Sequence, residues 1–337
     1  MKRQILVYDI ETFYNLFTVT FYIRKKEEYK QFVIHDELNQ YDELLEFLFS
    51  DHWIMIGFNN ETFDYPVIHH MINHKNEYTQ LNGLSLAGNI YKKAQSIISE
   101  EFTTVWDNNK HIPQIDLFKI FHLDNKARRA SLKDIEVAMN LPLVEDMPFE
   151  HNAWIRNQDE IDQVLSYNKN DTYATWQFFE LTIGNTNFPL YKNKNKIQLR
   201  QEIARRYNVP CMNWNDVKIG EQLILKLYCD TFGYNPKNIK QLRTFRPEIK
   251  LKDCIPTWAK FTDPKFKELI KFFERSAIHG TETKNVLEFN LINHGIRFDY
   301  GIGGLHASIK SGIYEEDDIW GIYDWDIDLM LGQLKLI

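Results

Sequence analysis

Apolar and polar residues alternate along the first third of the chain in a pattern that predicts a sheet covered by helices. Three segments rich in β-branched and aromatic residues predict strands joined by short polar turns: 5–9, 16–23 and 30–35. Apolar residues recur at helical spacing over 41–49, which predicts an amphipathic helix. The apolar run 53–58 predicts another buried strand, and a helix is expected to begin near Pro66. This order of elements indicates an α/β fold with a mixed sheet.

The middle of the chain has a weaker pattern over 75–115 and clearer ones after it. Segment 114–118 predicts a short strand, and Ser131 is a suitable N-cap for a helix that follows it. Apolar residues lie near one face of a long helix expected over 158–183. Asparagine and lysine dominate 185–195, which indicates a domain boundary.

The remainder predicts a smaller α+β region with several proline-containing loops. Its expected elements are helices over 196–232 and 264–275 and a strand over 286–298. We therefore expect two domains, 1–185 and 186–337.

Charge is distributed unevenly along the 337 residues, although the formal net charge is only −7. Residues 1–191 are acidic, 192–275 are basic and 276–337 are acidic again. This asymmetry is expected where metal chemistry and phosphate binding are divided between domains, and a solvated basic face is the alternative.

Cysteine usage and the N-terminus exclude several protein classes. Cys211, Cys229 and Cys254 lie far apart and form no CxxC pair, which argues against a disulfide framework or a zinc site. The apolar run after the basic start ends at Asp9, too early for a signal peptide, and no run is long enough for a membrane span. We expect a soluble cytoplasmic protein without a membrane partner.

Asp9 and Glu11 are the first candidates for chemistry. They lie two residues apart at the end of a predicted buried strand, so both side chains leave the same face of it. Two adjacent carboxylates repel each other and lose hydration unless a cation lies between them. Oxygen ligands suit Mg²⁺ or Mn²⁺. The alternative is a frayed strand end whose acids are solvated.

Two further acidic residues extend this candidate site. Asp64 lies between the predicted strand 53–58 and the following helix, where a carboxylate is common. Asp171 lies four residues after Tyr167 in the long helix, so the two side chains share a helix face. If Asp171 lies on the apolar face of the helix, its carboxylate needs a partner. The alternative is that the helix is rotated slightly and Asp171 is solvated on its surface.

These segments resemble the three Exo motifs of proofreading 3′–5′ exonucleases, in the tyrosine-containing branch of the DEDD superfamily found in family B DNA polymerases. The matching segments, in order, are Asp9-Ile10-Glu11 (DxE), Asn60-Glu61-Thr62-Phe63-Asp64 (Nx2-3(F/Y)D) and Tyr167-Asn168-Lys169-Asn170-Asp171 (Yx3D). The segment Ser131 to Ile135 resembles the (S/T)Lx2h motif between them, and the local style is similar to phage-encoded polymerases. The resemblance implies a ribonuclease H-like exonuclease domain, located in the host cytoplasm if the chain is phage-encoded.

The resemblance also implies roles for these residues. Asp9, Glu11, Asp64 and Asp171 would hold two Mg²⁺ or Mn²⁺ ions, and Tyr167 would orient the attacking water. Residues that would contact a single-stranded 3′ end are Asn60, Phe63, Ser131 and Leu132. The alternative for Phe63 and Leu132 is that they pack in the core. The alternative for Asn60 is that it is a turn residue.

The end of the chain resembles the start of a polymerase domain. Tyr300-Gly301-Ile302-Gly303-Gly304 resembles the YxG(G/A) motif that contacts the template, with a plain glycine-rich turn as the alternative. Asp326 matches the aspartate of polymerase motif A, but the SLYP continuation of that motif is absent. We therefore expect an incomplete polymerase palm that cannot extend DNA alone, in a truncated, frameshifted or split polymerase.

The leading hypothesis is the proofreading exonuclease part of a family B DNA polymerase, which acts on single-stranded DNA 3′ ends and on primer-template. One rival is a non-catalytic subunit that docks a separate chain carrying palm, fingers and thumb. Another rival is a free-standing DEDD nuclease that acts on RNA.

Overall fold

The computed structural model describes residues 3–99, 104–124, 130–242, 246–258, 260–279, 289–301 and 304–308. The chain divides into two compact units, Met1–Pro236 and Lys237–Ile337. Each unit is described by itself below.

A six-stranded mixed sheet forms the centre of the first unit, with the order β4-β3-β2-β1-β5-β6. β1 pairs antiparallel with β2 and parallel with β5, and β5 pairs parallel with β6. The strands are β1 (Gln4–Phe13), β2 (Leu16–Ile23), β3 (Glu28–His35), β4 (Leu38–Asn39), β5 (Trp53–Gly57) and β6 (Gln114–Asp116). The expected mixed sheet is confirmed in this unit.

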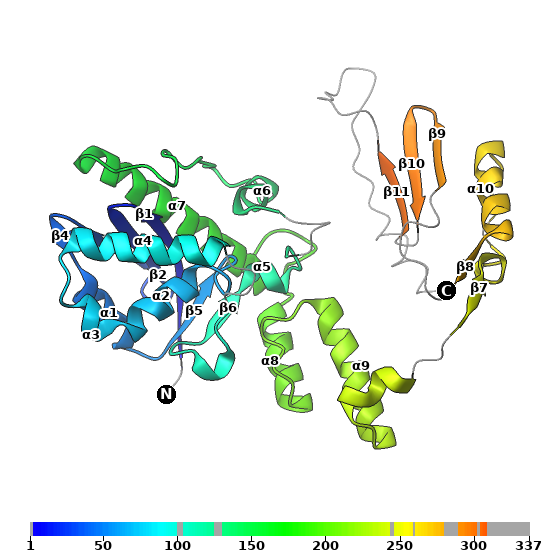
Figure 1. Ribbon diagram of the computed structural model, residues 1–337, viewed down its shortest axis with the longest axis horizontal. Coiled ribbons are helices and arrows are strands. Elements are labelled where there is room, and N and C mark those ends of the chain that lie inside the picture. The colour runs from blue at the N-terminus through cyan, green and yellow to red at the C-terminus, as the bar shows by residue number, and fades with distance from the viewer. Residues whose placement is uncertain are drawn as a thin grey trace. The chain divides into compact units, whose positions relative to one another are not determined.

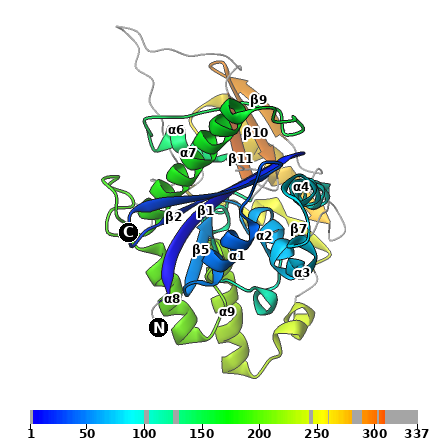
Figure 2. The same cartoon turned by 90° about the vertical axis from the view of Figure 1, so that its left-hand side faces the viewer.

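Helices cover both faces of this sheet. The helices are α1 (Tyr41–Phe49), α2 (Asp64–Asn73), α3 (Lys75–Tyr78), α4 (Gly83–Ser99), α5 (Leu117–Ile120), α6 (Leu132–Ala138), α7 (Gln158–Thr182), α8 (Lys196–Tyr207) and α9 (Asp216–Phe232), with a 3₁₀ turn at Asp107–Asn109. α1, α2 and α4 lie on one side of β1 and β2, and α7 lies on the other side (Figures 1 and 2).

The alternation of side chains along β1 positions the candidate site. Leu6, Tyr8 and Ile10 point into the core beneath α1, α2 and α4. Val7 points to the opposite face, where it packs with residues of α7. Because successive side chains of a strand alternate between faces, Asp9 and Glu11 follow Val7 onto the α7 side.

The structure also differs from the expected elements in the first unit. α4 lies within the segment 75–115, where the polar sequence gave no clear pattern. The expected helix over 196–232 is two helices, because Asn208 adopts a left-handed conformation (φ 52°) after α8 and Pro210 follows it.

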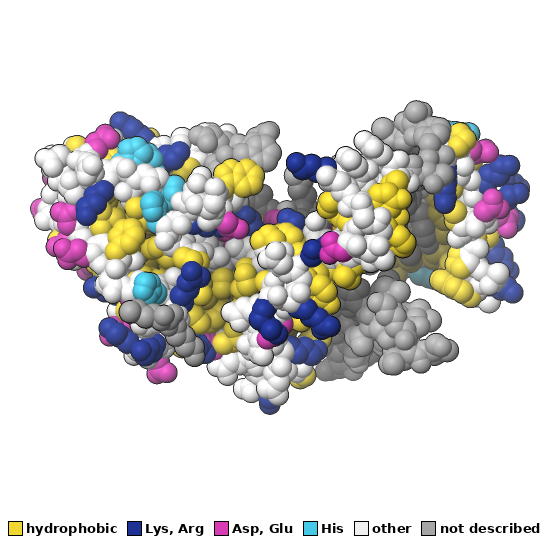
Figure 3. Space-filling model, turned by 90° about the horizontal axis from the view of Figure 1, so that it is seen from below, with side chains coloured by type: hydrophobic (Ala, Val, Ile, Leu, Met, Phe, Trp, Pro, Cys, Tyr) yellow, Lys and Arg dark blue, Asp and Glu magenta, His cyan; other side chains and the backbone are white. Residues whose placement is uncertain are grey.

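α8 and α9 belong to the first unit, and Asn213 between them joins the edge strand β6. Its amide donates to the carbonyl oxygen of Gln114 (3.0 Å), and its side-chain oxygen accepts from the backbone N–H of Asp116 (2.9 Å). Val217 and Ile224 of α9 are exposed. Figure 3 shows the molecule from below, where apolar side chains are interspersed with lysines and arginines. The boundary expected after residue 185 stays a prediction.

The second unit contains two small sheets and one helix in its described part. The strands are β7 (Glu248–Lys250), β8 (Ala277–His279), β9 (Phe289–Asn293), β10 (Ile296–Gly301) and β11 (Gly304–Ser308), with the helix α10 (Pro264–Arg275) and 3₁₀ turns at Pro236–Leu242 and Leu251–Cys254. The single strand expected over 286–298 is wrong where the structure describes it: His294 and Gly295 have positive φ angles of 51° and 79° and form a tight turn between β9 and β10.

No helix in the described part of the chain is both long enough and apolar enough to cross a membrane.

Candidate active site

Three carboxylates meet between the sheet and α7. Asp9 and Glu11 come from β1, and Asp171 comes from the middle of α7, which packs against β1 and β2. Each of the three offers an oxygen atom, and these atoms lie within 4.8 Å of one another. The structure thus brings together side chains that are separated by most of the first unit's sequence.

Asp64 lies beside this cluster, at the first residue of α2. Its side chain is only 6% exposed, and its Oδ1 accepts a hydrogen bond from the backbone N–H of Ile10 (3.3 Å). Ile10 is the residue between Asp9 and Glu11, so the bond fixes Asp64 next to the strand that carries them. The charge of Asp64 raises the pKa of Asp9, which places the two carboxylates within electrostatic reach.

Burial dominates the electrostatics of the site. It raises the pKa of Asp9 and of Glu11 well above their usual values, and the neighbouring carboxylates raise both further. Burial also raises the pKa of Asp64 to about 7 and that of Asp171 to about 7. A divalent cation would offset this repulsion, and an all-oxygen donor set suits a hard ion such as Mg²⁺ or Mn²⁺.

Tyr167 lies one helical turn before Asp171 and is 8% exposed. A hydrogen bond from its hydroxyl lowers the pKa of Asp171. Burial, followed by the charges of Asp171 and Glu11, raises the pKa of Tyr167 well above its usual value. The phenol therefore stays protonated at neutral pH and acts as a hydrogen-bond donor rather than a base.

Asn168 orients Asp9, a role that the sequence analysis missed. Its side chain is fully buried, and its Nδ2 donates to Asp9 Oδ2 (2.7 Å). Its Oδ1 accepts from the hydroxyl of Thr20 on β2, which in turn accepts from Gln31 Nε2 on β3 (3.0 Å). A chain of hydrogen bonds across three strands therefore holds one carboxylate of the site. The sequence contains one indication of this role, because Asn168 is a polar residue on the apolar face of α7.

Lys133 on α6 is a cation whose charge acts on the carboxylates of the site. Its charge lowers the pKa of both Glu11 and Asp171. Its Nζ lies 5.7 Å from the centre of the Tyr167 ring and 2.5 Å from Asp146 Oδ1. Lys133 lies inside the segment Ser131 to Ile135, and its positive charge is the feature of the sequence that could have indicated this role.

The residues expected to contact DNA have different surroundings. Asn60 is fully buried, and its Nδ2 donates to Gln114 Oε1 (2.9 Å) and to the Tyr8 hydroxyl (3.3 Å). Its position in the core means that a DNA contact requires the side chain to turn outward. Phe63 is partly buried and packs against the core under α2. Contacts of Asn60 and Phe63 with DNA stay predictions.

Ser131 is the N-cap of α6, as the sequence predicts. Its Oγ accepts from the backbone N–H of Asp134 (3.1 Å), and the Asp134 carboxylate accepts from the backbone N–H of Ser131 (2.7 Å). This capping box fixes the start of the helix that carries Lys133. Leu132 is half-buried, and its contact with a terminal base stays a prediction.

The glycine-rich segment of the second unit forms a hairpin. The backbone of Tyr300 lies in β10, and Gly304 begins β11 opposite Gly301. Gly303 and Asp326 lie outside the described residues. Their expected roles, and that of Tyr300, stay predictions.

Asp116 supports the loop that leads to Asp64, although it was not a candidate. It is fully buried, and its Oδ1 accepts from the backbone N–H of Asn59 (3.0 Å) while its Oδ2 accepts from that of Glu61 (3.2 Å). Glu61 forms ion pairs with Lys110 and with Lys119, the latter at 2.9 Å. The loop between β5 and α2 is therefore anchored from β6 and its flanking segments.

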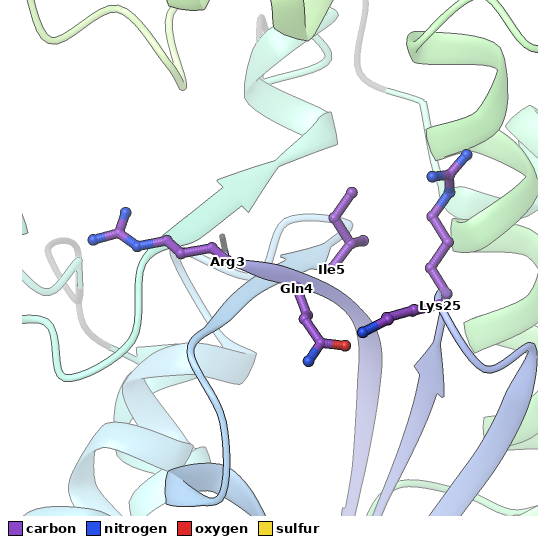
Figure 4. A pocket seen from close by; sticks show the side chains of 5 residues that line it. Arg3, Gln4, Ile5 and Lys25 are labelled. Carbon is purple, nitrogen blue, oxygen red and sulfur yellow. The ribbon is translucent and has the colours of Figure 1, made fainter. Parts of the chain in front are cut away.

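A separate cavity of about 410 Å³ lies at the start of β1 and is lined by basic and polar side chains (Figure 4). Arg3, Gln4, Ile5 and Lys25 surround it, together with Arg24. A strand rises roughly 3.3 Å per residue, so Glu11 lies about 20 Å further along β1 than Ile5. This cavity is therefore not part of the carboxylate site.

Comparison with known proteins identifies the family of the first unit. A family model described as the RNase_H superfamily matches residues 6–183, which is more than half of the chain. No curated protein and no solved structure matches the chain. Nucleases with an RNase H-like fold use divalent metal ions, and Asp9, Glu11 and Asp171 are placed to bind one. The chain belongs to the RNase H superfamily.

Proposed function

We propose that this chain is a 3′–5′ exonuclease that removes terminal nucleotides from DNA by metal-dependent hydrolysis, as the proofreading part of a family B DNA polymerase. The observation that carries the proposal is the meeting of Asp9, Glu11 and Asp171 within 4.8 Å, beside Asp64 and with Tyr167 one turn from Asp171. Each of these five residues belongs to one of the three exonuclease motifs of the sequence.

The carboxylates divide between two metal positions in this proposal. Asp9, Glu11 and Asp171 would hold one ion, and Asp64, whose charge acts on Asp9, would help to hold a second. When bound, the ions lower the pKa of a water and stabilise the attacking and leaving oxygens of the phosphodiester. Asn168 fixes the orientation of the Asp9 carboxylate through its hydrogen bond to Oδ2.

Tyr167 and Lys133 act on the water and the phosphate. The neutral Tyr167 hydroxyl donates a hydrogen bond and orients the attacking water, since its raised pKa excludes it as a base. Lys133, whose Nζ lies 5.7 Å from the centre of the Tyr167 ring and whose charge lowers the pKa of Glu11, attracts the phosphate group of the substrate. Phe63 and Leu132 stack on the terminal bases, which favours a single-stranded end of any sequence.

The direction of degradation and the type of nucleic acid test this function. Four 5′-labelled single strands are incubated with the full chain and Mg²⁺: DNA, RNA of the same sequence, DNA with a blocked 3′ terminus, and DNA with a blocked 5′ terminus. We expect a ladder shortened from the 3′ end with DNA, unchanged by the 5′ block and abolished by the 3′ block. Faster degradation of RNA, or cleavage of the 3′-blocked strand, contradicts the proposal.

A further inference from the structure

Glu136 is a buried carboxylate that the proposed mechanism does not use. It lies on α6 with no exposed surface, and neither of its carboxylate oxygens has a hydrogen-bond partner among the described residues. A buried polar group without a partner destabilises the fold, and a charged one destabilises it more. Protonation removes the charge of Glu136 but leaves a neutral carboxyl group that still needs a hydrogen-bond partner.

The neighbours of Glu136 belong to the nuclease site. α6 packs against α7, the helix that carries Tyr167 and Asp171. Lys133, one turn before Glu136 on the same helix face, lies over the Tyr167 ring. The negative charge of Glu136 raises the pKa of Asp171. Lys133 forms no hydrogen bond with Glu136, whose carboxylate oxygens have no partner among the described residues, and its ammonium group binds Asp146.

Glu136 is not one of the carboxylates whose oxygen atoms meet within 4.8 Å; in the described part of the chain these are Asp9, Glu11 and Asp171. What connects Glu136 to the site is the packing of α6 against α7 and the effect of its charge on Asp171, so any role at a metal ion held there is indirect. Mg²⁺ keeps several of its water molecules when a protein binds it. Such waters are strong hydrogen-bond donors, and a second carboxylate that accepts from them is a usual partner of a metal site.

We propose that Glu136 is an outer ligand of the metal site, whose carboxylate accepts hydrogen bonds from water molecules bound to the divalent ion held by Asp171. The proposal rests on the metal-dependent function proposed above and adds a positioning residue that acts through water. It also gives the two unpaired oxygens of Glu136 the donors that the described residues do not supply.

Calorimetric titration of Mn²⁺ into the full, EDTA-stripped chain tests this role. Glu136→Gln and Glu136→Met are compared with wild type, and Glu46→Gln on the exposed face of α1 is the matched control. We expect the Kd for Mn²⁺ to rise about 10-fold or more in both Glu136 variants and to stay unchanged in the control. The metal-free Tm of Glu136→Met should equal or exceed that of wild type, because methionine fills the space without unpaired polar atoms.

The metal dependence of DNA degradation gives a second readout. Both Glu136 variants should need more Mn²⁺ for half-maximal rate yet reach a rate within about twofold of wild type at saturating Mn²⁺. An unchanged Kd in both variants overturns the inference, and a lower metal-free Tm with an unchanged Kd identifies Glu136 as a packing residue. If wild type binds no Mn²⁺, the inference and the proposed function fail together. If wild type binds Mn²⁺ and degrades DNA while both variants match it, only the inference fails.

Discussion

Replacing Asn168 by alanine tests whether the buried hydrogen-bond chain holds Asp9 in place. The change removes the donor to Asp9 Oδ2 at 2.7 Å and the acceptor of the buried Thr20 hydroxyl. A hydrogen bond to a charged group contributes about 1.5–3 kcal/mol and a neutral one about 0.5–1.5 kcal/mol, so the free energy of unfolding should fall by about 3 kcal/mol. For a unit of this size the Tm should fall by roughly 6–12 °C.

The loss should depend on pH. The hydrogen bond from Asn168 lowers the pKa of Asp9, against the larger effect of burial, so Asn168→Ala raises that pKa further. An acid whose folded pKa is raised stabilises the fold below its unfolded pKa, near 3.9, and loses that stability as pH rises toward the folded pKa. The difference in Tm between wild type and Asn168→Ala should therefore be larger at pH 8 than at pH 5.

Thermal unfolding in EDTA at both pH values measures this effect. Titration with Mn²⁺ measures the affinity of the carboxylate site for a metal ion. Asn170→Ala is the matched control, because the buried Nδ2 of Asn170 has no partner among the described residues. We expect Asn168→Ala to bind Mn²⁺ about 10–100-fold more weakly and Asn170→Ala to stay close to wild type. A Tm for Asn168→Ala within 2 °C of wild type at pH 8, with unchanged Mn²⁺ affinity, refutes the reasoning.

Three further predictions concern the electrostatics of the first unit. Lys133→Ala should raise the pKa of Asp171 and move the acidic limb of the pH–rate profile to higher pH; a profile shifted to lower pH contradicts this. Glu61→Gln leaves Lys110, 5% exposed, with the exposed Asp107 as its remaining ionic partner (2.7 Å), and should lower the free energy of unfolding by about 2 kcal/mol in urea unfolding; a change below about 0.5 kcal/mol argues against a structural ion pair. The pKa of Asp64 and of Asp171 is raised to about 7, so metal-free stability should fall as pH rises from 4 to 8, and a rising Tm in EDTA over this range is the contrary result.

The parts of the fold that the sequence predicts are those with a strong local pattern. The continuous apolar run that leads to Asp9 and the apolar face of 158–183 predict β1 and α7, which together carry Asp9, Glu11 and Asp171. The order of motifs along the chain then indicates that these side chains belong to one site. Local periodicity is sufficient to place these three residues, because the position of each along its strand or helix determines the face on which its side chain lies.

The missed parts depend on partners that are distant in sequence. Asn168 and Thr20 are 148 residues apart, and nothing in either local segment specifies their hydrogen bond. α4 is a different case: its buried residues Leu86, Ile90, Ala94 and Ile97 recur at helical spacing, a local pattern that was present in the sequence but was not recognised within the polar segment 75–115. Asn60 reads as a turn residue, yet its side chain enters the core to bind Gln114 on a strand formed much later in the chain.

Release of the terminal nucleotide from 3′-labelled single-stranded DNA, measured for wild type and Asp9→Ala side by side, tests the carboxylate site most directly. Each protein is assayed with Mg²⁺, with Mn²⁺ and with EDTA, and Glu46→Gln is the control for an acid removed from the surface. We expect release by wild type and Glu46→Gln with either metal, none in EDTA, and a loss of at least about 100-fold in Asp9→Ala. Release that survives Asp9→Ala would contradict the assigned site, and no release by wild type with either metal would contradict the nuclease function itself.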